Sequence, residues 1–189
     1  GNPATAAFVT RRSTRVYSRA MPNVRRVRLD PAATGDASTI AGLRNHAADE
    51  LTREFGQGHW SSHASERGVL AEMKRSRVYV VRRRGVIIAT LALQTRKPWA
   101  IDASYFTPCK HPLYLTNMAV SPQRQRIGIG RACLDAARVI AHDWPADCIR
   151  LDAYDAEAGA GEFYAQCGFR EVGRAVYRSV GLVYYELIL

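Results

Sequence analysis

A predicted strand, a glycine-spaced turn and a predicted amphipathic helix follow one another in the middle of the chain. The strand is LYLTNMAV at 113–120, and the turn begins the segment SPQRQRIGIGRACLDAA at 121–137. Such a turn aims backbone N–H groups at one point, where the positive end of the helix dipole adds to them. The unit therefore predicts an anion site, and a polyphosphate is the natural occupant.

The glycines of this turn discriminate between the known phosphate-binding patterns. The dinucleotide pattern G-x-G-x-x-G fails because Cys133 stands where the third glycine belongs, and no G-K-[ST] follows for a P-loop. What remains is Q-x-x-G-x-G, from Gln125 to Gly130. Gly128 and Gly130 let the backbone come close to a ligand because they carry no Cβ. Three arginines add positive charge around the turn: Arg124, Arg126 and Arg131.

Strands and helices alternate along the rest of the chain in a way that predicts one α/β (α+β) domain with a mostly antiparallel sheet. A parallel strand–helix–strand unit spans 113–154 within it. Asp36 is the expected cap of the first helix, Asp30-Pro31 ends the first strand, and Pro145 stops the helix after the turn. The expected strands are 24–29, 77–83, 86–95, 113–120, 148–154, 169–179 and 181–189. The other expected helices are 37–55, 64–74 and 158–168, and 96–112 is an irregular loop rich in aromatic residues and proline.

The net charge of +10 is concentrated at the N-terminal end, where residues 1–28 contain seven arginines and no acidic residue. We expect residues 1–22 to be a basic, disordered tail and residues 23–189 to form the single domain. An arm that binds nucleic acid is the alternative, and a disordered tail is favoured because few aromatic residues accompany the arginines. No apolar run approaches the roughly 20 residues of a membrane span, so no membrane partner is expected.

The four cysteines and five histidines have no spacing typical of a metal site. We therefore expect no metal, reduced cysteines and a cytoplasmic setting. The sequence leaves open whether the chain forms a homodimer.

Two motifs in register give the chain a recognisable pattern. LTNMAVSP followed by Q-x-x-G-x-G and an amphipathic helix, and then EFYAQCGFREVG at 162–173, resemble the GNAT superfamily, the Gcn5-related N-acetyltransferases. The second motif matches the family's F-Y-x-x-x-G-F segment. The order and spacing agree over about residues 24–189, although the N-terminal half agrees only in the order of its elements. The resemblance implies a mixed sheet flanked by about four helices, with splayed fourth and fifth strands.

The resemblance also implies acetyl-CoA as the acetyl donor. In this family the pantetheine arm pairs with the end of the fourth strand like an added strand, and the Met118 N–H would donate to the thioester oxygen. The pyrophosphate would be held by the turn, with Gln125 beside it. The implied cofactor-binding residues are Met118, Ala119, Val120, Gln125, Arg126, Ile127, Gly128, Ile129, Gly130 and Arg131.

Tyr164 occupies the tyrosine of the F-Y-x-x-x-G-F segment, and the resemblance makes it the candidate general acid for the departing thiolate. A phenol with a pKa near 10 is protonated at neutral pH and can donate. The alternative is that Phe163 and Tyr164 are only core aromatic residues.

The general base is harder to assign because Thr116 and Asn117 occupy strand positions where many family members have a carboxylate. Asp102 is the first candidate, and Glu50 and Glu54 on the first helix follow, acting through water. An acceptor amine that arrives neutral needs no base. Asp152 is expected to be a structural hydrogen-bonding group.

The irregular loop offers apolar walls and one carboxylate, a combination suited to a cationic amine. The candidate acceptor-binding residues are Trp99, Asp102, Tyr105, Phe106, Glu50 and Glu54. The expected function is N-acetylation of a small-molecule or protein amine by direct transfer. The alternative is an acyl-CoA-binding module without catalysis.

Overall fold

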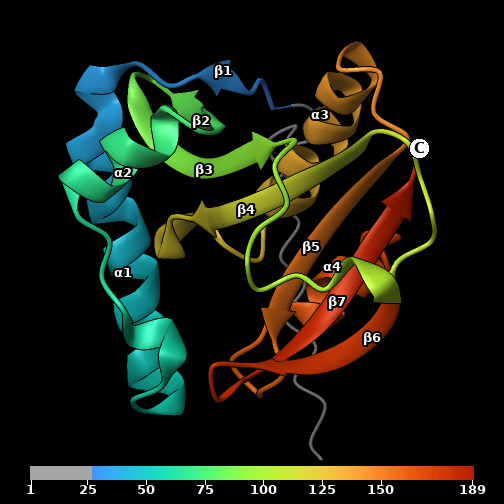
Figure 1. The fold of residues 1–189 in the computed structure, drawn as a ribbon. Coiled ribbons are helices and arrows are strands. Elements are labelled where there is room, and N and C mark those ends of the chain that lie inside the picture. The colour runs from blue at the N-terminus through green and yellow to red at the C-terminus, as the bar shows by residue number, and fades with distance from the viewer. Residues whose placement is uncertain (1–26) are drawn as a thin grey trace, which may run out of the picture.

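The computed structural model describes residues 27–189 and contains one seven-stranded sheet in the order β1-β2-β3-β4-β5-β7-β6 (Figure 1). The strands are β1 (Asp30–Pro31), β2 (Arg77–Arg83), β3 (Val86–Gln94), β4 (Pro112–Val120), β5 (Cys148–Tyr154), β6 (Arg170–Tyr177) and β7 (Val180–Ile188). The α-helices are α1 (Ala37–Phe55), α2 (Glu66–Met73), α3 (Ile129–Asp143) and α4 (Gly161–Gln166). Short 3₁₀ turns are η1 (Thr34–Asp36), η2 (His59–Ser61), η3 (Ala103–Tyr105) and η4 (Pro122–Arg124). This is the expected mixed fold, whereas the predicted tail at 1–22 lies outside the described residues.

All neighbouring strands pair antiparallel except β4 and β5, which run parallel. That parallel pairing covers only three residue pairs, from Pro112 with Cys148 to Tyr114 with Arg150. Beyond Tyr114 the two strands diverge, as Figure 1 shows. The edge of β4 from 115 to 120 therefore faces β5 without a ladder, and the predicted splay of the fourth and fifth strands is confirmed.

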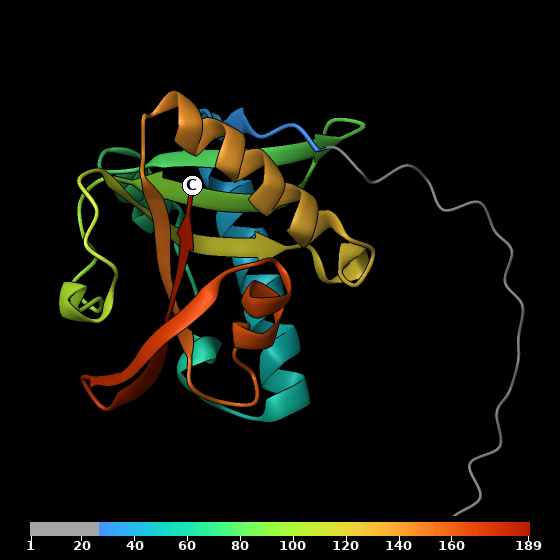
Figure 2. The same cartoon turned by 90° about the vertical axis from the view of Figure 1, so that its right-hand side faces the viewer.

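The alternation of side chains along the strands buries both faces of the sheet. On one face the apolar sides of α3 and α4 pack on all the central strands, in a core that includes Ile129, Leu134 and Tyr164. On the other face α1 and α2 cover β2 and β3, through residues such as Ile40 and Val69. Figure 2 shows α3 crossing one side of the sheet with α1 behind it. Because α1 and α2 reach only the first half of the sheet, the second half of that face needs another cover.

The loop between β3 and β4 supplies that cover. Phe106 is buried against Tyr184 of β7 with ring centroids 5.5 Å apart. Thr107 fixes the loop to the sheet, since its N–H and hydroxyl donate to the buried Glu186 carboxylate (3.0 and 2.6 Å) and its carbonyl accepts from Arg150 (2.8 Å). Of the loop's three large aromatic residues, Phe106 thus belongs to the core, whereas Trp99 and Tyr105 are exposed.

Cys109, at the end of this loop, forms a disulfide with Cys148 at the start of β5. The sequence predicts reduced cysteines, and for this pair the structure differs. The two residues are 39 positions apart, and only the parallel pairing of β4 with β5 brings them together. Cys133 and Cys167 are free and buried.

Two local predictions at the start of the domain were wrong. Asp30-Pro31 does not end a strand but is itself the strand β1, paired with Val80 and Tyr79. Of the strand expected at 24–29, residues 27–29 are not in a strand, and residues 24–26 lie outside the described part. Asp36 makes no capping hydrogen bond to α1. Its carboxylate instead accepts from the Ala33 N–H (2.8 Å) and from Arg82 (2.7 Å), because the chain enters α1 through η1.

Candidate active site

The glycine-spaced turn forms a cradle of free backbone donors at the start of α3. Gly128 has φ of +89° and is the residue before the helix, and Arg126 also has a left-handed φ of +60°. Within the described residues, the backbone N–H groups from Arg126 to Arg131 donate to no carbonyl or side chain; the first donor of the helix that is paired belongs to Ala132, which bonds Gly128 O at 3.0 Å. Six consecutive free donors at a helix N-terminus suit a polyphosphate.

Side chains fix this turn from three directions. The Gln125 amide donates back to the Val120 carbonyl (3.0 Å), which ties the turn to the end of β4. Arg131 donates to the Gln166 carbonyl of α4 (2.7 Å), and Arg126 lies 3.9 Å from Glu54 of α1. The turn therefore links both layers of helices to the sheet.

Gly130 has a packing role that the sequence did not reveal. A Cβ at this position would lie 3.0 Å from Phe163 Cζ and 3.7 Å from Met118 Cε. The missing side chain thus makes room for α4 and for β4 at the place where these elements meet the turn. By contrast, a Cβ on Gly128 would meet no atom within 4 Å, so glycine is needed there for its backbone conformation.

A bulge interrupts β4 beside the turn. Thr116 pairs with Ala92 and Ala119 pairs with Thr90, so Asn117 and Met118 together face one residue of β3. Asn117 has φ of +51°, a left-handed conformation that asparagine tolerates better than most residues. A bulge of this kind re-aims the strand's backbone and side chains, and here it does so at the residue expected to contact the thioester.

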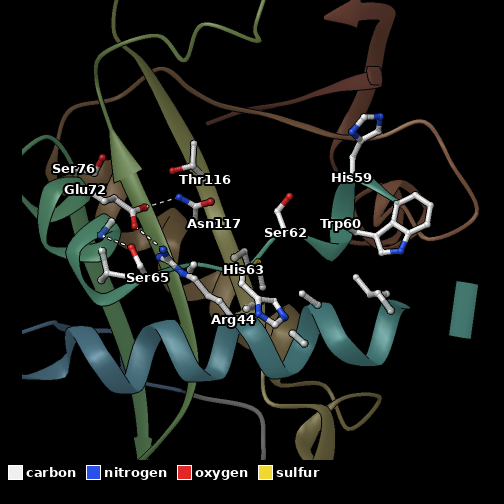
Figure 3. A pocket seen from close by; sticks show the side chains of 18 of the residues that line it. Arg44, His59, Trp60, Ser62, His63, Ser65, Glu72, Ser76, Thr116 and Asn117 are labelled. Atoms are coloured by element: carbon white, nitrogen blue, oxygen red, sulfur yellow. Dashed lines mark hydrogen bonds and ion pairs between the residues drawn. The ribbon is translucent and has the colours of Figure 1, made fainter. Parts of the chain in front are cut away.

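A cavity of about 650 Å³ lies against this bulge on the face of the sheet that carries α1 and α2 (Figure 3). Its walls are α1, the segment 59–65, α2 and β4. Tyr154 of β5 closes it beyond the splay, where the Tyr154 ring meets Trp60 edge-on at 6.2 Å and its hydroxyl donates to the His59 carbonyl (3.3 Å). Pockets for small molecules typically have volumes of about 300–1,000 Å³. The cavity includes Thr116, Asn117, Met118 and Ala119 and therefore borders the expected thioester position.

A buried ion pair lies in the wall of this cavity. The Glu72 carboxylate of α2 accepts from the Arg44 guanidinium of α1 (2.6 Å) through one oxygen and from the Asn117 amide (2.7 Å) through the other. The side chains of Arg44 and Glu72 are only 12% and 10% exposed. One carboxylate thus joins the two helices to the bulge, and removing it would leave a buried charge without its partner.

Tyr164 lies in the core beside the splay, with its ring packed among Phe163, Phe169 and Tyr185. Burial raises the pKa of its phenol well above the ordinary value, and the charge of Asp152 raises it further. Its hydroxyl makes no hydrogen bond to any described residue, so it is a protonated donor without an assigned acceptor. Both alternatives from the sequence, general acid and core aromatic, are compatible with this position.

Asp152 on β5 carries a partly buried carboxylate without a hydrogen bond to another residue of the described part. Burial raises its pKa. It pairs across the sheet with Tyr184. Because side chains alternate along a strand, Asp152 shares its face of the sheet with Arg150. Arg150 pairs with Tyr114 of β4, so Tyr114 and Thr116 lie on that face too. The expectation of a structural hydrogen-bonding role for Asp152 therefore has no support in the structure.

The candidate residues of the β3–β4 loop lie away from the cavity. None of the four lines it: Trp99, Asp102, Tyr105 and Phe106. Asp102 bonds the Ser104 N–H and hydroxyl (3.0 and 2.8 Å), and these bonds lower the pKa of its carboxyl. Tyr105 lies over Gly173 of β6, where a Cβ would collide with its ring.

The two candidate carboxylates of α1 also point elsewhere. Glu50 pairs with Arg53 and lies 3.8 Å from His46, and Glu54 faces Arg126. Neither lines the cavity, although Leu51 and Ala48 of the same helix do. The structure thus brings together Met118, Ala119 and the turn, but not these acceptor-site candidates.

Sequence reasoning missed Arg44, Glu72 and Asn117 as a group. Glu72 sits at a buried position of α2 between Val69 and Met73, so a charge on the apolar face of a short helix was the available signal. Its partners lie 28 and 45 residues away and could be identified only from the fold.

Other site types find no support within residues 27–189. No group of three or more His, Cys, Asp or Glu side chains there could hold a metal ion. None of the helices in that range is long and apolar enough to cross a membrane.

Comparison with known proteins identifies this arrangement. The model of the Acetyltransferase (GNAT) family matches residues 44–169. An acetyltransferase of the GNAT family from Listeria monocytogenes superposes with a TM-score of 0.68 at 18% identity, over 86% of this chain and 95% of that one. The ribosomal-protein-S18-alanine N-acetyltransferase of Escherichia coli gives 0.63 at 18%, over 86% and 93%. The putative acetyltransferase yncA of Salmonella typhimurium, solved with its cofactor acetyl-CoA, gives 0.62 at 16%, over 86% and 94%. No protein of curated function matches the chain by sequence.

Proposed function

Because the chain belongs to the GNAT acetyltransferase family, we propose that it transfers an acetyl group directly from acetyl-CoA to an acceptor amine. The observation that carries this proposal is the row of six free N–H donors at 126–131 beside the unpaired edge of β4. A pyrophosphate and an extended pantetheine arm need these two features next to each other. If this glycine turn only began a helix, its backbone N–H groups would have no reason to stay unpaired.

The fit of this chain to acetyl-CoA can be assigned residue by residue. The backbone from Arg126 to Arg131 binds the pyrophosphate, and Gln125 holds the turn against β4. Met118, Ala119 and Val120 pair with the pantetheine arm along the open edge. Acetyl-CoA supplies an activated acetyl group as a thioester, and its sulfur leaves as a thiolate.

The bulge gives Met118 its role in the reaction. Negative charge develops on the thioester oxygen as the amine attacks, and a fixed backbone N–H stabilises that charge at no reorganisation cost. We assign this donor to the Met118 N–H. The Asn117 amide, held by Glu72, keeps the bulge in place from the cavity side.

Tyr164 acts as the general acid in this proposal. Its raised pKa keeps the phenol protonated throughout the neutral range, so the proton is available when the thiolate departs. The two free cysteines do not compete as nucleophiles: burial raises the pKa of Cys133 to about 12 and also raises that of Cys167. Because a thiol is nucleophilic only as the thiolate, this favours direct transfer.

We assign the general base to Asp152 in place of Asp102; because Asp152 does not itself line the cavity, it acts through water. A carboxylate whose pKa is raised by burial is a stronger proton acceptor than an exposed one. Asp152 lies on the cavity face of β5, close enough for its charge to affect the pKa of Tyr164 and of Tyr154. Glu50, Glu54 and Asp102 do not line the cavity, so each would act as the base only through water molecules that connect it to the acceptor amine.

The test is turnover of acetyl-CoA with a broad panel of amines, in which the released CoA thiol is measured. Acetylated product in proportion to thiol supports transfer. Tight CoA binding without turnover of any amine would favour the alternative, an acyl-CoA-binding module.

A further inference from the structure

The cavity beside the bulge has an excess of positive charge. Arg44 and Arg75 line it, with the imidazoles of His59 and His63 and the hydroxyls of Ser62, Ser65 and Ser76. Glu72 is the only carboxylate among its lining residues, and Arg44 neutralises it at 2.6 Å. Arg75 forms no ion pair with any residue in 27–189, so its charge is not compensated. A cavity of this composition attracts an anion and repels a second cationic group.

The Arg44 guanidinium has unused hydrogen-bonding capacity. Its Nη1 contacts Glu72, but Nε and Nη2 are shielded from solvent and have no acceptor within the described part. A buried donor without a partner costs about 1–3 kcal/mol. Arg44 lines the cavity, and a carboxylate bound there would supply the missing acceptors once the guanidinium turned toward it. Arginine suits this role because its planar fork matches a carboxylate.

The same contacts place this positive end close to the reacting centre. Arg44 and Asn117 bond the two oxygens of one carboxylate, that of Glu72, and Asn117 directly precedes Met118 in the chain. Arg44 and Met118 also line the same cavity, so an acid group held by Arg44 and an amine that attacks at Met118 share one site. Free amino acids carry these two groups close together, because one carbon joins their amine and carboxylate.

The other end of the cavity is less polar. Figure 3 shows Trp60 and His59 on the side away from Glu72 and Ser76. Leu51, Trp60 and Tyr154 line that end and offer apolar surface for a side chain. Access there runs past exposed residues such as His59 and Ser62, which leaves room for side chains of different length.

We propose that the acceptor is a free amino acid whose carboxylate binds at Arg44 and Arg75, with the amine toward Met118 and the side chain toward Trp60. This proposal rests on the acetyltransferase function proposed above. It distinguishes a small carboxylate-bearing amine from the ε-amine of a protein lysine and from a polyamine.

The experiment compares matched acceptors in steady-state kinetics at saturating acetyl-CoA. Leucine and phenylalanine are paired with leucinamide and phenylalaninamide, and spermidine and a lysine-containing peptide complete the set. We expect kcat/KM to be at least roughly tenfold higher for each acid than for its amide, because a charged hydrogen bond contributes that much or more. The amides have the less basic amine, so a larger neutral fraction favours them, and a preference for the acids is not an effect of amine ionisation.

Variants separate recognition of the carboxylate from folding. Arg75→Gln is expected to lower kcat/KM for the acids by roughly tenfold and to leave the amides unchanged. Arg67→Gln is the matched control, since Arg67 is an exposed arginine of α2 that does not line the cavity, whereas Arg75 lies in the turn just after that helix. Arg44→Gln also removes the ion pair with Glu72, so the thermal midpoint of this variant is measured together with its kinetics to separate a loss of folding from a loss of recognition.

A binding measurement makes the proposal testable without turnover. Calorimetry on the protein with CoA bound should give measurable affinity for N-acetylleucine and much weaker affinity for N-acetylleucinamide. Amides, spermidine or the peptide reacting as well as the acids would overturn the amino acid acceptor while the transferase function stands. Failure of every amine, with CoA still bound, would overturn the transferase function itself.

Discussion

Substitution of Gly128 by valine is the sharpest test of the proposed pyrophosphate cradle. Gly128 has φ of +89°, and a Cβ built there meets no atom within 4 Å. The change therefore acts through backbone conformation and not through a steric clash. Gly85, in the β2–β3 turn, has φ of +78° and an equally open Cβ position, but it lies far from the turn in sequence and belongs to a hairpin. Gly85→Val is thus a control with the same kind of strain.

The expected magnitudes differ between stability and binding. A left-handed conformation costs a residue with a Cβ about 1–2 kcal/mol, and more for a β-branched one. Both variants should therefore lose a similar amount of stability, roughly 2–8 °C in Tm for a chain of this size. In Gly128→Val the turn relaxes and re-aims its free N–H groups. Losing two charged hydrogen bonds of about 1.5–3 kcal/mol each weakens CoA binding by roughly 10² to 10⁴-fold.

Calorimetric titration of CoA into both variants, with thermal unfolding of each, measures the two effects separately. Gly85→Val should bind CoA like the parent protein despite its lower Tm. An unchanged CoA affinity in a folded Gly128→Val protein would refute the assignment of the pyrophosphate to this turn.

Three further predictions address the catalytic residues and the tail. Tyr164→Phe should leave CoA affinity within a few fold and lower the single-turnover rate by roughly 10² to 10⁴, the usual contribution of a general acid; an unaffected rate would make Tyr164 a core aromatic residue only. Asp152→Asn should slow transfer yet raise stability at neutral pH. The folded-state pKa of this carboxyl lies above its unfolded value, so the parent protein loses stability as the pH rises past the unfolded pKa, and the variant avoids that loss. The gain in Tm should shrink as the pH falls toward the unfolded value of about 3.9, and a variant that is less stable than the parent at pH 7 would contradict the argument. Removal of residues 1–22 should leave CoA affinity and Tm nearly unchanged, and loss of folding would show that the basic segment belongs to the domain.

Local patterns predicted most of the fold because they depend on neighbours in sequence. The Arg84–Gly85 turn, with both residues at positive φ, and the helix of Ile129, Ala132 and Cys133 follow directly from residue type and period. The F-Y-x-x-x-G-F and Q-x-x-G-x-G motifs together indicated the family, and Q-x-x-G-x-G also located the turn. The prediction for Asp30-Pro31 failed because a strand of two residues has no period to detect, and its partners Val80 and Tyr79 are 50 and 48 residues away.

The acceptor side of the site was less predictable because it is built from distant contacts. Asp102, Trp99 and Tyr105 form the pattern of a carboxylate among aromatic residues. The loop that carries them covers β6 and β7 through Ile101 and Phe106, and Trp99 itself is 80% exposed. For Glu72 the only local signal is a charge on the apolar face of a short helix, which does not name its partners. Packing of α1 and α2 on the bulge of β4 gives it those partners, the buried Arg44 and the exposed Asn117.

The seam of three residue pairs between β4 and β5 divides the sheet at one point of the chain. The strands β1 to β4 lie on one side in sequence and in space, and β5 to β7 lie on the other, while the β3–β4 loop crosses the seam to cover β6 and β7. A cut between α3 and β5 therefore separates two sets of strands, which share a core across Leu113 and Ile149. Once the disulfide between Cys109 and Cys148 is reduced, two such fragments are suited to reassociate, so the fold offers a site for a split protein whose reassembly reports on the ligand that bridges the seam.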